Sequence, residues 1–345
     1  MQLSMQLSYA GGFKEGVEQV VAYEKAGLDL VWVAEAYTFD APTSMGYLAA
    51  RTERVKIGSG ILPLYTRTPS VLAMTAAGLD ALSEGRCVLG LGASGPQVIE
   101  GFHGVVYDRP LGRTREIIDI CRQVWRREKV EHQGTSYQIP LPPGQGTGLG
   151  KPLKLINHPV RSAIPIYIAS LGPKNVEMTA ELADGWLPLF YLPEKAKQVW
   201  GDDLAAGAAK RSPDLAPLDV VAGGLLSVGD GAERVREFAR GTVALYTGGM
   251  GAKGRNFYND LIKRYGYEAE AEQIQDLYLD GKKDEAAALV PDDLLESMTL
   301  CGPEGYVRER LAAFKESGVT TLNVTPIGPD PVKLIEQVKG WIEDL

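Results

Sequence analysis

The stretch Val55–Pro69, VKIGSGILPLYTRTP, decides the fold and contains the first candidate site. It begins with an apolar, β-branched run, which is typical of a buried strand. The run ends at Gly58-Ser59-Gly60-Ile61, and the loop beyond it contains Pro63 and Pro69. Small residues at the end of a buried strand leave room for a flat ligand to lie against the backbone. An ordinary strand-to-helix turn has the same composition, so this stretch alone leaves both interpretations open.

Outward from this stretch, a pattern of strand, loop and helix repeats along the chain. The other predicted strands cover residues 3–9, 28–33, 87–91, 164–169, 185–189, 220–228 and 319–325. The predicted helices cover residues 13–26, 43–51, 69–82, 111–127, 175–183, 194–210, 232–246 and 331–345. Eight such units predict an α/β fold, a (β/α)8 TIM barrel, with a doubly wound sheet as the alternative. We expect one domain over residues 1–345, because barrels of this kind reach this length as a single unit.

Two segments break the repeat and are predicted to be insertions. Residues 130–161, after the fourth helix, are rich in Gly, Pro and Thr and show neither strand nor helix period. They predict a surface loop with a small hairpin around Gly134. Residues 247–300, after the seventh helix, begin with Gly248-Gly249-Met250-Gly251 and continue as polar segments that predict short helices.

Composition restricts the classes of partner. The net charge of −8 over 345 residues argues against nucleic acid or an anionic membrane surface. No apolar run is long enough for a membrane span and no signal peptide is apparent, so a cytoplasmic protein is expected. Cys87, Cys121 and Cys301 are predicted to be reduced, buried thiols. The three histidines are not clustered, so no metal site is expected.

Ligands of such barrels bind where strands end and helices begin, and two further loops there are candidates for an anion. The segment Gly90–Gly95 follows the fourth strand and fits the pattern G-x-G-x-x-G. A dinucleotide site would have an acidic residue at the end of a second strand about 20 residues further on, but the predicted helix 111–127 occupies that position, so the segment is either a tight turn or an anion loop at Ala93-Ser94-Gly95. Ala169-Ser170-Leu171-Gly172 precedes a helix N-terminus, which favours an anion, and simple capping is the alternative. Together the two loops favour one phosphorylated ligand across the barrel mouth.

Few side chains at the predicted mouth suit acid–base chemistry. Glu35 ends the second strand, and Glu100 and His103 lie in the loop after the fourth. A solvated loop carboxylate and a structural histidine are the ordinary alternatives. Arg67 follows the Gly58–Ile61 bend and is most simply a surface arginine or one that forms an ion pair.

Several of these segments resemble one known family. The segment Gly58–Pro69 is similar to the strand-three signature of luciferase-like flavin and deazaflavin oxidoreductases. Ala34-Glu35, Gly92–Gly104 (GASGPQVIEGFHG), Pro165–Asn175 (PIYIASLGPKN) and Ala183–Trp186 (ADGW) extend the match. The resemblance spans about residues 1–230 and the last strand, and it is closest to the coenzyme F420-dependent branch.

The resemblance implies an isoalloxazine-type ring in the barrel mouth, supported from behind by a non-proline cis peptide bond at Gly60–Ile61. It implies hydride transfer between C5 of coenzyme F420 and a small organic substrate, phosphate loops at Ala93–Gly95 and Ala169–Gly172, and a homodimer. From the residues at the predicted mouth, we expect Glu35 and His103 to be catalytic. The residues that we expect against the coenzyme are Ser8, Glu35, Ser59, Gly60, Ile61, Ala93, Ser94, Gly95, Ala169, Ser170, Leu171 and Gly172.

The sequence departs from the sugar-phosphate dehydrogenase branch at two places. That branch has an Asp-His pair after strand two and an Asn-Glu pair after strand four, where this chain has Glu35-Ala36 and Pro96-Gln97. We therefore expect a substrate other than a sugar phosphate, with the proton exchanged by Glu35, Tyr37, Glu100, His103, solvent or the substrate. The alternatives are an FMN-dependent monooxygenase of the same fold and a non-catalytic flavin-binding protein.

Overall fold

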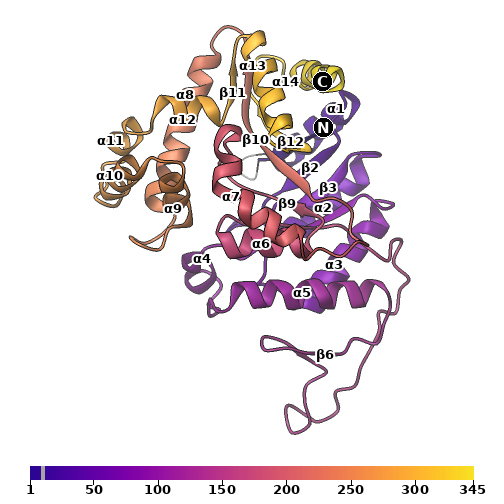
Figure 1. Cartoon of the computed structure of the whole chain (residues 1–345). Coiled ribbons are helices and arrows are strands. Elements are labelled where there is room, and N and C mark those ends of the chain that lie inside the picture. Colours follow the sequence, from indigo (N-terminus) through magenta and orange to yellow (C-terminus); the bar gives the residue numbers. More distant parts are fainter. Residues whose placement is uncertain (9–11) are drawn as a thin grey trace.

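The computed structural model describes residues 1–8 and 12–345, and within these ranges eight parallel strands close into a barrel (Figure 1). The strands follow the order β12-β1-β2-β3-β5-β8-β9-β10, and β10 pairs back onto β12. Their bounds are Gln2–Leu7 (β1), Leu30–Val33 (β2), Lys56–Ser59 (β3), Cys87–Gly92 (β5), Ile166–Ile168 (β8), Gly185–Trp186 (β9), Asp219–Val228 (β10) and Thr321–Pro326 (β12). The TIM barrel is confirmed.

The predicted helices form within a few residues of their expected bounds. They are α1 (Phe13–Lys25), α2 (Ala41–Arg51), α3 (Pro69–Leu82), α5 (Pro110–Trp125), α6 (Pro173–Leu182), α7 (Pro193–Ala208), α8 (Ala232–Ala244) and α14 (Pro331–Asp344). Local chemistry explains several starts: the side chains of Asp40, Thr68 and Asp330 accept a hydrogen bond from a backbone N–H in the first turn of α2, α3 and α14. No helix in the described ranges is long and apolar enough to cross a bilayer.

Several elements were not expected from the sequence. A short helix, α4 (Pro96–Gly101), lies within the loop after β5. A three-residue strand, β11 (Leu300–Gly302), pairs with the end of β10, and α13 (Glu304–Glu316) follows it. Strand β11 depends on its pairing with β10, which no local pattern reveals, whereas α13 has the buried spacing Val307, Leu311 and Phe314 of an ordinary amphipathic helix.

Both predicted insertions are present. In the first, β6 (His132–Gln133) and β7 (Gln138–Ile139) form the expected hairpin around Gly134. The second contains a π-helical turn (Leu245–Gly249) and the helices α9 (Phe257–Arg264), α10 (Glu268–Leu279), α11 (Lys283–Ala288) and α12 (Asp292–Ser297). Figure 1 shows α9, α10 and α11 gathered beside α8.

The barrel interior is filled by large side chains, so a ligand can only lie above them. Leu30, Trp32, Val88, Tyr167 and Val221 form a buried interior cluster. The rings of Trp32 and Tyr167 are 5.5 Å apart, and the Tyr167 hydroxyl donates to Asp219 at 2.6 Å. A Cβ atom on Gly58 would lie 2.4 Å from the Trp32 ring, so glycine is required there to admit the indole.

Candidate active site

The opening stretch bends at the barrel mouth as the family resemblance implies. β3 ends at Ser59, the Gly60–Ile61 peptide bond is cis, and the chain resumes as β4 (Leu62–Pro63), which pairs with the end of β5. The hydroxyl of Ser59 is buried between the strands, where it donates to the Gly90 carbonyl and accepts from the Gly90 N–H, both at 2.8 Å. Ser59 therefore joins β3 to the neighbouring strand, and its side chain is not presented to a ligand.

A floor of small residues lies directly above the interior cluster. Because side chains alternate along a strand, the residues two positions beyond Trp32, Gly58, Gly90 and Tyr167 face the same interior. They are Ala34, Gly60, Gly92 and Ala169. A Cβ atom on Gly92 would lie 3.1 Å from Ile61 Cγ1 and 3.3 Å from Ala169 Cβ, so these groups are contiguous. We call Ala34, Gly60, Gly92 and Ala169 the mouth floor.

Two buried hydrogen-bond donors near the mouth floor lack a partner within the described chain, Gln6 Nε2 and Trp32 Nε1. A Cβ atom on Gly60 would lie 3.1 Å from Trp32 Cβ and 3.3 Å from Gln6 Oε1, which places both side chains against the floor. Buried donors are almost always satisfied, so these two fit a ligand with acceptor atoms. Neither residue was expected at the site; the available signal was the polar alternation Ser4, Gln6, Ser8 on the first strand.

Glu35 is at the mouth, but its carboxylate is fully engaged. Arg67 donates to both of its oxygens at 2.6 and 2.8 Å, and the Ala41 N–H at the start of α2 donates at 2.9 Å. The expected ion pair of Arg67 is confirmed. This arrangement suits a residue that fixes the loops after β2 and β4, and it leaves the catalytic role of Glu35 a prediction.

His103 lies in a loop that meets the Glu35 loop. The ring of Phe102 contacts both His103, at 5.1 Å, and Tyr37, at 6.1 Å. His103 Nε2 is buried without a hydrogen-bond partner in the described chain. Glu100, by contrast, accepts from the Tyr107 N–H at 3.1 Å. Among the acid–base candidates, His103 therefore has a ring nitrogen still available to a ligand.

The two expected anion loops differ in the groups that they present to a ligand. Ser94 has a left-handed backbone with φ of 58°, between Ala93 and the Gly95 that precedes α4. In the second loop, the Ser170 hydroxyl is buried against the Thr179 hydroxyl at 2.9 Å. The Leu171 carbonyl accepts from Trp200 Nε1 at 2.9 Å and from Arg264 at 3.1 Å. The side chain of Ser170 thus holds the loop in place, and a ligand there would be bound by backbone groups.

Ser8, at the end of β1, lines a small hollow with Ala34 and Phe39. Tyr9, the last residue of the predicted first strand, lies outside the described residues. A separate hollow lined by Met1, Gln2 and Val319 lies where the strands begin, at the opposite end of the barrel. It is therefore not part of the site.

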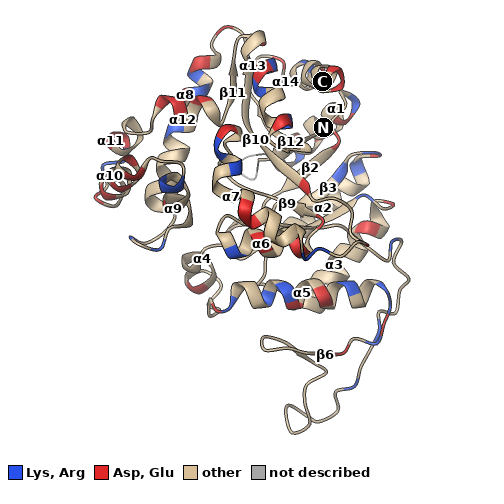
Figure 2. Ribbon diagram, in the orientation of Figure 1, with Lys and Arg blue, Asp and Glu red and all other residues tan. Residues whose placement is uncertain are grey.

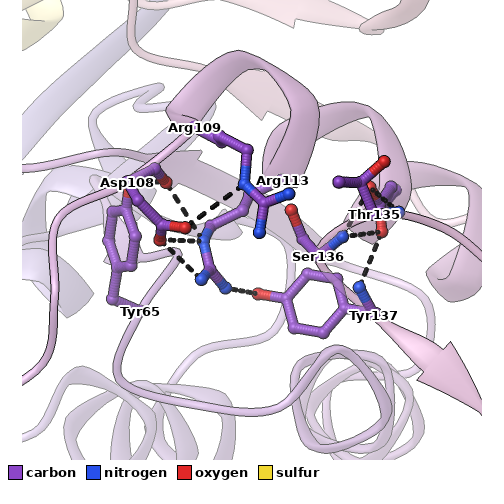
Figure 3. Close-up of polar contacts among 8 residues, drawn as sticks. Tyr65, Asp108, Arg109, Arg113, Thr135, Ser136 and Tyr137 are labelled. Atoms are coloured by element: carbon purple, nitrogen blue, oxygen red, sulfur yellow. Dashed lines mark hydrogen bonds and ion pairs between the residues drawn. The ribbon is translucent and has the colours of Figure 1, made fainter.

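Tyr65 belongs to a hydrogen-bonded network that connects the chain after the Gly60–Ile61 bend to the first insertion (Figure 3). Its hydroxyl donates to the Asp108 carbonyl at 2.9 Å, and the Arg113 guanidinium lies 5.1 Å from its ring centre. Arg113 also donates to the Asp108 carboxylate at 2.6 Å and to the Tyr137 hydroxyl at 3.2 Å. The hydrogen bond from Arg113 lowers the pKa of Asp108, and burial raises the pKa of Tyr65. The network fixes the edge of the mouth on this side.

Known proteins resemble this chain over nearly its whole length. The family model for luciferase-like monooxygenase matches residues 1–321. A Mycobacterium tuberculosis protein assigned to the coenzyme F420-dependent oxidoreductases is 42% identical over 341 residues, 96% of this chain and 97% of that protein.

Solved structures share the fold. The coenzyme F420-dependent tetrahydromethanopterin reductase from Methanopyrus kandleri superposes with a TM-score of 0.80 at 23% identity, covering 99% of this chain and 98% of its own. An F420-dependent secondary alcohol dehydrogenase in complex with an F420-acetone adduct gives a TM-score of 0.73 at 20% identity, covering 99% and 98%. From its sequence match and its barrel, the chain belongs to the luciferase-like monooxygenase family.

Proposed function

We propose that this protein is a coenzyme F420-dependent oxidoreductase acting on a small organic molecule. The observation that carries the proposal is the mouth floor, where small residues adjoin the unpaired donors of Gln6 and Trp32. A flat, polar ring system fits such a surface. The 42% identical relative supports F420 as the coenzyme.

The chain's own residues would have separate roles in binding the coenzyme and in transferring the proton. Gly60, Ile61, Gly92 and Ala169 would support the ring, and Gln6 and Trp32 would donate to its acceptor atoms. The backbone of Ala93–Gly95 and of Ala169–Gly172 would hold the phosphate-bearing tail. When bound, the coenzyme supplies a hydride donor or acceptor at C5. His103 Nε2 would exchange the accompanying proton with the substrate, while Glu35 holds Arg67 and the start of α2 in position.

Coenzyme titration tests the proposal. We expect the purified chain to bind F420 with micromolar or better affinity, followed by tryptophan fluorescence or coenzyme absorbance, and to bind FMN at least about tenfold more weakly. Tight FMN binding with no F420 binding would favour an FMN-dependent monooxygenase. F420 binding without turnover of any compound in a broad small-molecule screen would favour a non-catalytic carrier.

We also propose that the protein is a homodimer. The outward face of α3 presents Val71, Met74 and Leu82, which are 42%, 55% and 68% exposed. Their spacing places them on one stripe of the helix, together with Gly78, beside which a Cβ atom would meet nothing within 4 Å. A second copy of the chain would cover this apolar stripe. Light scattering at micromolar concentration should give twice the mass of the 37.3 kDa chain.

The three cysteines are free and buried, as expected, and burial raises the pKa of each thiol. These thiols are consistent with a reducing compartment, and we propose a cytoplasmic location.

A further inference from the structure

Exposed apolar side chains gather on the loops around the barrel mouth. Large hydrophobic residues are exposed after β2, after β5, after β9 and in the second insertion: Tyr37, Phe39, Phe102, Val106, Leu189, Met250 and Phe257. An apolar rim around a ligand site indicates a ligand that is itself apolar.

The order of the strands places two of these loops across the mouth from each other. β2 and β9 are four positions apart in the closed eight-strand order, which is half of the circumference. The loop with Tyr37 therefore faces the loop with Phe190. The distance between them is spanned by the mouth floor, so a ligand on the floor lies between the two loops.

The β9 side carries a compact aromatic cluster, which we call the aromatic wall: Phe190, Tyr246 and Tyr258. The ring centres of Tyr246 and Tyr258 are 4.8 Å apart with perpendicular planes, and Phe190 lies 5.3 Å from Tyr246 and 6.2 Å from Tyr258. Tyr258 lies in α9 of the second insertion, and Tyr246 lies in the π-helical turn through which the insertion begins. This part of the chain thus supplies two of the three rings of the wall.

Phe190 adopts a costly backbone conformation to join this wall. Its φ of 54° is left-handed, which a bulky side chain rarely adopts and which costs on the order of 1 kcal/mol or more. The Tyr265 hydroxyl donates to the Phe190 carbonyl at 2.7 Å and holds this conformation in place. Such strain is concentrated at functional sites, where it sets the direction of a side chain.

A further tyrosine, Tyr107, borders the first anion loop and interacts electrostatically with Tyr258. Burial raises the pKa of Tyr258, and the hydroxyls of Tyr246 and Tyr107 raise it further. The Tyr107 ring is 5.1 Å from Tyr65, and its hydroxyl donates to the Ser94 carbonyl at 3.5 Å. Tyr107 therefore connects the expected coenzyme loop to Tyr65 at the edge of the mouth.

Helix α9 holds the wall against the second anion loop as well. Tyr258 is the second residue of α9, and Arg264 is the last. Arg264 donates to the carbonyls of Leu171 and Val199. The insertion is therefore attached directly to Ala169–Gly172.

Charge at the mouth disfavours an anionic substrate. The loops after β2 and β9 (residues 34–40 and 187–192), which face each other across the mouth, contain no Lys or Arg. Arg67 and Arg109, in the loops after β4 and β5, pair with Glu35 and Asp108. Figure 2 shows the charged residues mostly on the outer helices, with the barrel strands largely free of them. A carboxylate or phosphate on the substrate would find little compensation in these loops.

We propose that the aromatic wall of Phe190, Tyr246 and Tyr258 is the specificity element of the substrate pocket, and that the pocket accepts a neutral, apolar molecule that bears a ring. This inference rests on the proposed coenzyme site for its geometry. The substrate ring lies against the aromatic wall, with the mouth floor and its coenzyme on the adjoining side.

The test uses the full chain loaded with F420 and three probes followed by saturation-transfer NMR: 2-naphthaldehyde, 2-naphthoate and glucose 6-phosphate. We expect 2-naphthaldehyde to bind at least about tenfold more tightly than either anion. Tyr258→Ala should raise its Kd by about tenfold, because one aromatic contact is lost. Tyr258→Phe should retain the affinity, and the Kd for F420 should stay within about twofold in both variants.

Phe238→Ala is the matched control, since Phe238 is 72% exposed on α8 and is not part of the aromatic wall. Tighter binding of either anion than of 2-naphthaldehyde overturns the inference, as does an unchanged Kd in folded Tyr258→Ala. If that variant does not fold, Tyr258→Leu retains more apolar volume than alanine, removes the aromatic ring and decides the question by the same change in Kd. Failure of the wild type to bind F420 would refute the coenzyme proposal alone, because 2-naphthaldehyde binding to the coenzyme-free chain still tests the aromatic wall.

Discussion

Glu35 and Arg67 form an enclosed ion pair at the barrel mouth, with side chains only 7% and 17% exposed. Removing one partner leaves the other charge uncompensated, so Glu35→Gln should lower the free energy of unfolding by about 3 kcal/mol. The double variant Glu35→Gln/Arg67→Met should recover part of that loss. Urea denaturation of both variants measures the difference.

Glu35→Gln and the double variant also distinguish a positioning role of Glu35 from a catalytic one. If Glu35 only holds the loops, the double variant should keep most of its F420 affinity and of any turnover that a substrate screen finds. Loss of turnover with unchanged F420 affinity and restored stability would instead assign Glu35 to the reaction.

Gly92 tests the mouth floor. A valine there adds atoms where even a Cβ is 3.1 Å from Ile61 and 3.3 Å from Ala169, so the neighbours must move and the floor rises. Gly92→Val should weaken F420 binding by at least about tenfold and cost about 1–3 kcal/mol of stability. The control is Gly340→Val, on the outer surface of α14, where an added Cβ meets nothing within 4 Å. It should change neither the F420 affinity nor the stability. Equal F420 affinity in both variants would show that the ring lies elsewhere.

At the scale of elements, strand β3 is attached to helix α1 by one carboxylate. Glu24 is buried and accepts from the backbone N–H groups of Glu53, Arg54 and Val55, the last two at 2.6 and 2.7 Å. Burial by itself would raise the pKa of Glu24, but these three hydrogen bonds outweigh it and the pKa is lowered. The ionised form thus fixes the start of the strand that ends at Gly60.

The lowered pKa of Glu24 gives a pH dependence with a defined sign. Its contribution to stability is complete above the unfolded-state pKa of about 4.3 and is lost as the pH falls through the lower folded-state pKa. At pH 7, the free energy of unfolding of Glu24→Gln should be about 1.5–3 kcal/mol lower than that of the wild type. Between about pH 5 and pH 3, the free energy of unfolding should fall less in the variant than in the wild type. Glu18→Gln on the same helix removes a carboxylate that is 56% exposed and pairs with Arg51, so it should cost at most about 1 kcal/mol. A parallel pH response of the wild type and Glu24→Gln in denaturant titrations would contradict the assignment.

Elements with strong local patterns were predictable from the sequence, and elements that depend on distant partners were not. The period of α3 and the Gly-rich bend after β3 are local features, and both were located correctly. The strand β11 exists only because Leu300 pairs beside Leu226, and Gln6 became a site residue only because Gly60 lies above its amide. Likewise, the buried hydroxyls of Ser59 and Ser170 point to neighbouring elements, a direction that their loop sequences do not encode.

At the scale of the whole molecule, the apolar stripe on α3 should govern association. Met74→Asp places a charge in the middle of the proposed contact, where burial without a partner is unfavourable. We expect this variant to be a monomer by light scattering, with a melting temperature and an F420 affinity close to those of the wild type. A Met74→Asp protein that remains a dimer would mean that another surface joins the subunits.

Helix α9 has a consequence for how proteins of this architecture can diverge. Tyr258 in its first turn belongs to the proposed aromatic wall, and Arg264 at its end donates to the Leu171 carbonyl in the loop after β8. Recognition and attachment would therefore occupy different turns of one short helix. Mutations in the first turn can change which molecules are accepted without loosening the attachment. An ancestor with this insertion could therefore acquire new substrates in small steps, each of which leaves the inherited coenzyme machinery intact.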